Sequence, residues 1–135
     1  MPDSIELNVV TPERLLVRED VESVEAPGKA GYLGILPGHA AFVGQMGTGV
    51  LSYQADGRRR TLAVSGGFIE VLSGRVRVLA DVAERGEEID VDRAKAALKR
   101  AQDAVAKAAT SAEDPTIATC ALERANARIA AAEQK

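Results

Sequence analysis

The feature that most constrains the fold of this chain is a change of composition near residue 87. All twelve glycines and all four aromatic residues lie at or before Gly86, whereas 16 of the 24 alanines lie in the last 45 residues. Glycine mixed with β-branched residues is typical of short strands and turns, and alanine mixed with Lys, Arg and Glu is typical of helices. We therefore expect a β-sandwich over residues 1–86 and a two-helix hairpin over residues 87–135.

Alternation of apolar and polar side chains predicts the strands of the first part. It recurs in short runs at residues 5–9, 21–26, 50–54, 59–64, 68–72 and 75–79, each followed by a turn signal. Asp56-Gly57 joins two of these runs and supplies the positive φ angles that a tight hairpin needs. The spacing favours an all-β sandwich of about ten short antiparallel strands.

Helical periodicity predicts the second part. Asp90 is a good N-cap for a first helix, whose apolar stripe is Ala94, Ala97, Leu98, Ala101, Ala104, Val105 and Ala108. Residues 110–114 interrupt the pattern, Asp114 is the expected next cap, and Pro115 suits the first position of a second helix. The second stripe is Ala118, Ala121, Leu122, Ala125, Ile129 and Ala132. The short loop predicts an antiparallel hairpin, and its alanine interface predicts that the hairpin is held only weakly.

Charge and residue inventory exclude several classes of function. A formal net charge of −3 gives no basis for expecting nucleic acid as a partner. No run approaches the roughly 20 apolar residues that span a bilayer, so we expect no direct membrane insertion. The single histidine, His39, lies in a turn, and the chain has one cysteine, so neither a nucleophile–base pair nor a metal site can be assembled. We expect no catalytic residue, no metal site and no required cofactor.

Four arginines are the exception in this inventory. Arg93 and Arg100 flank the first helical stripe, and Arg124 and Arg128 flank the second. In a folded hairpin the four guanidinium groups would converge at one edge, where they suit the phosphates of a nucleotide. By spacing alone, a solvated charged face is the better explanation, because charges beside an apolar stripe are usually solvated.

Three segments give the chain a recognisable resemblance. They are Gly-Tyr-Leu-Gly-Ile-Leu-Pro-Gly-His-Ala at residues 31–40, Gly-Gly-Phe-Ile-Glu-Val at 66–71 and Ala-Glu-Arg at 83–85. Together with the hairpin, they resemble the epsilon subunit of the rotary F-type ATP synthase of bacteria, in order and over essentially the whole chain. The fold of that family, a β-sandwich followed by a helical hairpin, agrees with the division at residue 87.

The resemblance implies a non-catalytic rotor subunit of the central stalk that couples the gamma subunit to the c-ring during ATP synthesis. It implies a peripheral place on the cytoplasmic face of the energy-coupling plasma membrane. The loop that holds His39 resembles the family's c-ring contact, and Tyr32 occupies a position that is charged in the family. We therefore expect Tyr32 and His39 to contact the c-ring.

The resemblance also implies regulation by ATP. In bacterial members the folded hairpin permits turnover, and the extended hairpin reaches the catalytic alpha and beta subunits and obstructs ATP hydrolysis. Some members bind ATP through Ile/Leu-Asp-x-x-Arg-Ala, and this chain matches at Ile89, Asp90, Arg93 and Ala94. Glu84, Arg100, Arg124 and Arg128 occupy the matching positions around the motif. A regulatory ATP, with or without Mg²⁺, is the expected ligand.

Two other functions fit the same residues. A stand-alone nucleotide sensor would use the sandwich only to hold the hairpin, and would not purify with other subunits. A protein-interaction module would leave the arginines solvated and would not respond to ATP. An enzyme ranks third because the residue inventory offers no catalytic pair.

Overall fold

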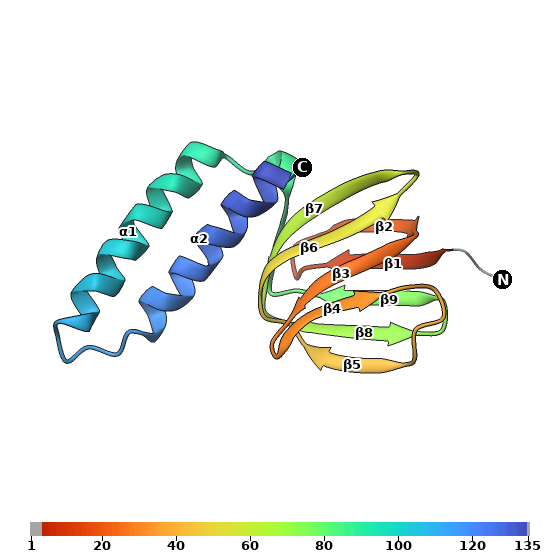
Figure 1. Cartoon of the computed structure of the whole chain (residues 1–135), viewed down its shortest axis with the longest axis horizontal. Coiled ribbons are helices and arrows are strands. Elements are labelled where there is room, and N and C mark those ends of the chain that lie inside the picture. The colour runs from red at the N-terminus through yellow and green to blue at the C-terminus, as the bar shows by residue number, and fades with distance from the viewer. Residues whose placement is uncertain (1–3, 135) are drawn as a thin grey trace.

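The computed structural model describes residues 4–134, and within them ten strands precede two helices (Figure 1). The strands are β1 (Ile5–Val10), β2 (Leu15–Val21), β3 (Ser23–Gly28), β4 (Gly31–Ile35), β5 (Phe42–Gln45), β6 (Thr48–Ala55), β7 (Arg58–Ser65), β8 (Phe68–Leu72), β9 (Arg75–Leu79) and β10 (Val82–Arg85). A 3₁₀ turn, η1 (Gly86–Glu88), leads to α1 (Val91–Ala109) and α2 (Thr116–Gln134). The sandwich followed by a helical hairpin confirms the predicted fold class.

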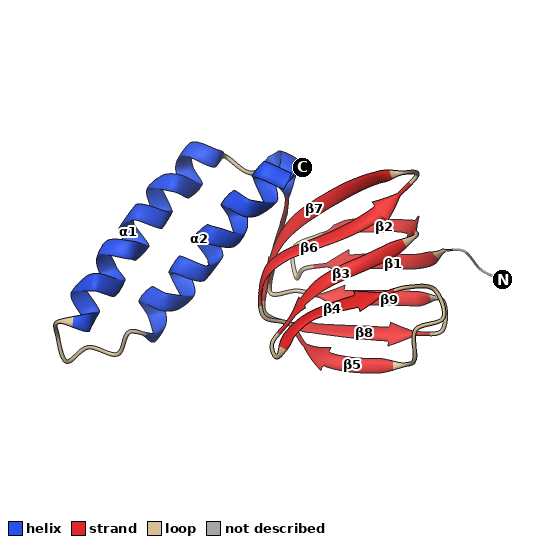
Figure 2. Ribbon diagram, viewed as in Figure 1, coloured by secondary structure: helices blue, strands red, loops and turns tan. Residues whose placement is uncertain are grey.

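The strands form two five-stranded sheets, in the orders β2-β1-β9-β8-β5 and β10-β7-β6-β3-β4 (Figure 2). The pairs within them are antiparallel except for β1 with β9, which run parallel. The sequence analysis did not predict this parallel pair. Side chains alternate in the same way in parallel and antiparallel strands, so a period of two carries no information on direction.

The core lies between the two sheets. Cross-strand neighbours such as Leu7 with Val76 and Val9 with Val78 turn the same face inward, and all four are fully buried. Leu51 and Leu62 face them from the other sheet. Between β6 and β7, Asp56 (φ 52°) and Gly57 (φ 73°) form the two-residue turn that the sequence predicted.

The helices begin close to the predicted positions. Asp90 Oδ1 accepts a hydrogen bond from the backbone N–H of Arg93 at 3.1 Å, which confirms Asp90 as the N-cap of α1. Asp114 Oδ1 accepts from the backbone N–H of Thr116 at 2.9 Å. Helix α2 begins at Thr116, one residue after the predicted start, because Pro115 supplies the first carbonyl acceptor and not the first helical residue.

Helix α2 is the middle layer between α1 and the sandwich. It packs against β6, β7 and β10, whereas α1 packs chiefly against α2 (Figure 1). Helix α2 therefore buries two faces. Ala125 and Ala132 belong to the predicted stripe, whereas Ala127 and Ala131 form a second one that packs with Val50, Ala63 and Ile89. The sequence analysis predicted only the first stripe.

Candidate functional site: the groove between the helices

A groove of about 740 Å³ runs between the two helices and reaches β10. Its floor is built mainly from alanines, which leave room because their side chains end at Cβ. Its polar walls carry four of the residues that the sequence analysis selected, namely Glu84, Arg100, Arg124 and Arg128. The structure thus brings together residues from β10, α1 and α2 that lie up to 44 positions apart in the chain.

Glu84 and Arg128 join the sandwich to α2 inside this groove. Arg128 Nε lies 2.8 Å from Glu84 Oε1, and Arg128 Nη2 donates to Glu84 Oε2 at 3.2 Å. The first contact is an ion pair whose N–H direction misses the oxygen, so the buried Nε has no aligned acceptor. A guanidinium has five N–H groups, and Glu84 occupies one edge, so the others remain available to a second anion.

Arg100 and Arg124 approach the groove from opposite helices. Both side chains are exposed, and together with Arg128 they place three guanidinium groups around one cavity. Guanidinium groups bind phosphate oxygens through pairs of parallel hydrogen bonds. An anion that reached all three arginines would bridge α1 and α2.

The motif at residues 89–94 has a different environment. Ile89 is buried beneath α2, Ala94 is buried against the second helix, and Asp90 caps α1. Arg93 is exposed and does not line the groove that holds the other three arginines. These positions explain the motif as the start of a helix, and its contact with a nucleotide stays a prediction.

Tyr32 and His39 lie at different places in the fold. Tyr32 is in β4, and its hydroxyl accepts a hydrogen bond from the backbone N–H of Val50 at 3.1 Å, across Gly49. His39 lies in the exposed loop after β4, with Nδ1 2.7 Å from the carbonyl oxygen of Ala40. Tyr32 therefore has a structural role in its own sheet. The contact of either residue with a c-ring stays a prediction.

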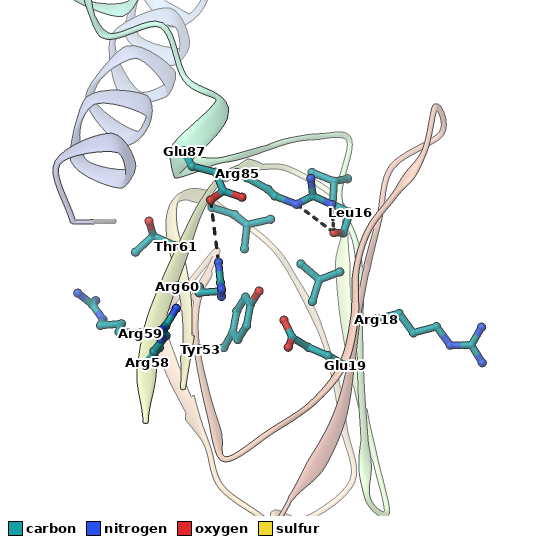
Figure 3. Close-up of a pocket in the computed structure, with 12 residues that line it drawn as sticks. Leu16, Arg18, Glu19, Tyr53, Arg58, Arg59, Arg60, Thr61, Arg85 and Glu87 are labelled. Atoms are coloured by element: carbon teal, nitrogen blue, oxygen red, sulfur yellow. Dashed lines mark hydrogen bonds and ion pairs between the residues drawn. The ribbon is translucent and has the colours of Figure 1, made fainter. Parts of the chain in front are cut away.

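A second cavity, of about 540 Å³, opens between strand β2 of one sheet and β7 of the other (Figure 3). Arg85 closes one end by donating to the carbonyl oxygen of Leu16 from Nη2 at 2.6 Å, and Arg60 lies 4.0 Å from Glu87. Tyr53 and Glu19 face each other in the gap. Burial and the Glu19 carboxylate hold the pKa of Tyr53 above its usual value. Two of the five arginines that line this cavity are paired, Arg60 with Glu87 and Arg85 with Glu88, and the Glu19 carboxylate adds a negative charge that opposes an anion.

Thr61, Gly86, Ala127 and Ala131 are residues at the helix–sheet contact that the sequence analysis missed. Thr61 Oγ1 donates to the carbonyl oxygen of Ala131 at 2.8 Å, and both residues are buried. Alanine at 127, 130 and 131 has helical spacing and was a usable signal for a second packed face. The sequence gives no signal for the contact of Thr61, because its partner is a backbone carbonyl oxygen.

Neither helix in the described part of the chain has an apolar stretch long enough to cross a bilayer.

Comparison with known families matches nearly the whole chain. Residues 4–86 match the model of the ATP synthase delta/epsilon chain β-sandwich domain, and residues 87–133 match that of the long α-helix domain. The chain is 55% identical to the ATP synthase epsilon chain of Solibacter usitatus over 135 residues, which cover all of both chains. It is 50% identical to that of Carboxydothermus hydrogenoformans over 107 residues, which cover 79% of this chain and 80% of the relative.

Solved structures show the same likeness. A chain in the Euglena gracilis mitochondrial ATP synthase, in a structure of its OSCP/F1/c-ring part, superimposes with a TM-score of 0.82 and 27% identity, covering 97% of this chain and 82% of the other. A chain in the central stalk and c-ring structure of the Tetrahymena thermophila mitochondrial ATP synthase superimposes with a TM-score of 0.53 over 62% of this chain and 68% of the other. At 15% identity, the second likeness concerns the fold alone.

Proposed function

The chain belongs to the ATP synthase delta/epsilon chain family, and from that premise we propose that its helical hairpin is an ATP-sensitive regulator of the complex. As an epsilon chain, it is a non-catalytic subunit of ATP synthase. We propose that it lies in the central stalk, with the gamma subunit and the c-ring as neighbours, and its likeness to a chain of a mitochondrial F1/c-ring structure supports this proposal. It sits peripherally on the cytoplasmic face of the energy-coupling membrane.

The observation that carries the regulatory proposal is the groove with Arg100, Arg124 and Arg128 around it. ATP offers the matching chemistry, since a triphosphate chain presents several anionic oxygens to guanidinium groups on both helices. ATP bound in this way requires the folded hairpin, because the arginines separate when the helices do. Magnesium ions can accompany the nucleotide and partly neutralise its charge.

Linkage converts such binding into regulation. A ligand that binds only the folded hairpin stabilises it by about 2.7 kcal/mol at a hundredfold excess over Kd. That amount is large for an interface whose buried residues are mostly alanine, such as Ala94 and Ala101 on α1. At low ATP the hairpin is released, extends towards the catalytic alpha and beta subunits, and slows ATP hydrolysis.

Calorimetric titration of the purified chain with ATP, and separately with ADP, tests the proposal. We expect saturable one-to-one ATP binding that Arg124→Ala weakens by roughly tenfold or more, since each charge-assisted contact contributes about 1.5–3 kcal/mol. Arg59→Ala is the matched control, because it removes an exposed arginine from the sandwich. Equal ATP affinity in the parent chain, Arg100→Ala and Arg124→Ala would refute the arginine site.

The regulatory half of the proposal needs the assembled enzyme. ATP hydrolysis by a complex that carries a chain truncated after residue 88 is expected to exceed that of the intact complex at low ATP. Identical rates at all ATP concentrations would leave the hairpin without an inhibitory role.

A further inference from the structure

Three residues that touch one another, Thr61, Gly86 and Ala131, lie in the interface between the hairpin and the sandwich. Thr61 lies on the outer face of β7, and its hydroxyl donates to the carbonyl oxygen of Ala131 at 2.8 Å. Ala131 belongs to the last turn of α2, so this contact holds the C-terminal end of the helix against the sheet. Thr61 is 5% exposed and Ala131 is fully buried, so the Thr61 hydroxyl makes a hydrogen bond that is shielded from water.

Gly86 makes the approach of α2 possible. A Cβ atom at this position would lie 2.5 Å from the carbonyl oxygen of Ala131 and 2.6 Å from Thr61 Oγ1. The Ala131 carbonyl oxygen is a backbone atom, so it cannot avoid the clash by a change of rotamer. A larger residue at 86 would therefore push α2 off the sheet and lengthen the hydrogen bond.

The segment between the sandwich and α1 is held separately. In η1, Glu88 forms ion pairs with Arg14 at 3.0 Å and with Arg85 at 2.9 Å. These contacts join η1 to the sandwich, so we take the chain after Glu88, at Ile89 and Asp90, as the pivot. Opening at this pivot leaves Gly86 in place and breaks the contact between Thr61 and Ala131.

We infer that Thr61 and Gly86 form a latch that sets how often α2 leaves the sheet, independently of the arginine groove. Thr61 provides the donor and Gly86 provides the space. The latch rests on the proposed function in one respect, because undocking of α2 is the step by which the hairpin would regulate the complex. Undocking is a property of the isolated chain, and the latch contains no groove arginine, so it can be tested without ATP.

The physical argument gives the direction of each substitution. Thr61→Val keeps the shape of the side chain and removes the donor, so the buried hydrogen bond to the Ala131 carbonyl is lost from the docked state alone. The undocked state, in which water reaches that carbonyl, is unaffected. The undocked population should therefore rise roughly 5- to 30-fold. Thr61→Ser keeps the donor, so its undocked population should be close to that of the parent chain.

A thiol placed in the contact measures undocking directly. Ala127 is buried against Val50 and Ala63, so Ala127→Cys in a Cys120→Ser background reacts with a thiol reagent only when α2 lifts. We expect the labelling rate to rise in Thr61→Val and in Gly86→Ala, and to approach the parent rate in Thr61→Ser. Thr48→Val is the matched control, because the Thr48 hydroxyl bonds to Ser65 within the sandwich.

Hydrogen exchange of the amides of β6 and β7 is measured in the same variants. Slow, unchanged exchange there combined with faster labelling supports the latch. An unchanged labelling rate in both Thr61→Val and Gly86→Ala would overturn it. Faster labelling that is accompanied by equally faster exchange in β6 and β7 would also overturn it, because the sandwich itself would then be opening.

Discussion

The carboxylate of Glu84 in β10 forms an ion pair with the guanidinium of Arg128 in α2, with Nε 2.8 Å from Oε1 and Nη2 3.2 Å from Oε2. One side chain belongs to the sandwich and the other to the hairpin. The pair therefore serves two purposes, since it docks α2 and it orients an arginine that also faces the groove. Other contacts between the sandwich and the hairpin include the Thr61 hydrogen bond and a small apolar cluster.

Removing Arg128 tests this double role. Arg128→Ala should weaken docking of α2 by about 1 kcal/mol, the usual range for a partly exposed ion pair, and should also weaken ATP binding. Arg128→Lys should recover less than half of either effect, because an ammonium cannot bind a carboxylate and a phosphate through separate edges. Labelling of a thiol at position 127 reports docking and calorimetry reports binding. Loss of both functions in Arg128→Ala with full recovery in Arg128→Lys would contradict the use of separate guanidinium edges for Glu84 and for the phosphate.

The two parts of the chain should differ in stability. Leu51→Ala removes a fully buried side chain from the sandwich core and should cost about 2–5 kcal/mol. Tyrosine fluorescence during urea unfolding reports this loss, because both tyrosines lie in the sandwich.

The hairpin counterpart is Ala101→Gly, in the middle of α1. It should destabilise the helices by about 1 kcal/mol and leave the tyrosine transition almost unchanged, because α1 packs chiefly on α2. Far-UV circular dichroism follows the helices in the same titration. A shift of the tyrosine transition as large as that of the helical signal would mean that sandwich and hairpin unfold as one unit.

Acid should loosen the segment between the two parts. The hydrogen bond from Arg14 and the charges of Arg14 and Arg85 hold the pKa of Glu88 below its ordinary value of 4.5. A lowered pKa means that the ionised carboxylate stabilises the folded chain. That contribution is present above about pH 4.5 and is lost as the pH falls through the lower, folded-state value.

Glu88→Gln should remove this part of the pH dependence of unfolding, and Arg14→Ala should remove most of it. The double variant should lose no more than Glu88→Gln alone, because both substitutions break the same contact. The measurement is the urea midpoint of unfolding of the parent chain and the three variants between pH 3 and 6. Additive losses would show that Arg14 and Glu88 act independently.

Several parts of this fold could be predicted because they depend on local chemistry. The change of composition at residue 87 separates sandwich from hairpin, Asp56-Gly57 has the φ angles of a tight turn, and Asp90 accepts the N-cap hydrogen bond. Each of these features is decided by a few neighbouring residues. Local propensity and tertiary structure agree at all three positions.

The remaining features depend on which surfaces meet. The parallel pairing of β1 with β9 leaves no mark on alternation, and the burial of Ala127 and Ala131 requires knowing that α2, not α1, faces the sheet. Helical spacing placed four arginines at one edge, but it could not fix where the groove opens, and Arg93 lies outside its lining. Tyr32 illustrates the same limit, since its partner is a backbone N–H eighteen residues away.

Hydrogen exchange of α1 and α2 at increasing ATP concentration tests the central claim most directly, with the sandwich as internal reference. If ATP bridges the groove arginines, exchange from the helices should slow in proportion to 1 + [ATP]/Kd, by about a hundredfold at a hundredfold excess, while exchange from the sandwich stays constant. Arg124→Ala should abolish most of the slowing. Helical exchange that is indifferent to ATP at concentrations well into the millimolar range would contradict the claim that the hairpin is an ATP-sensitive element.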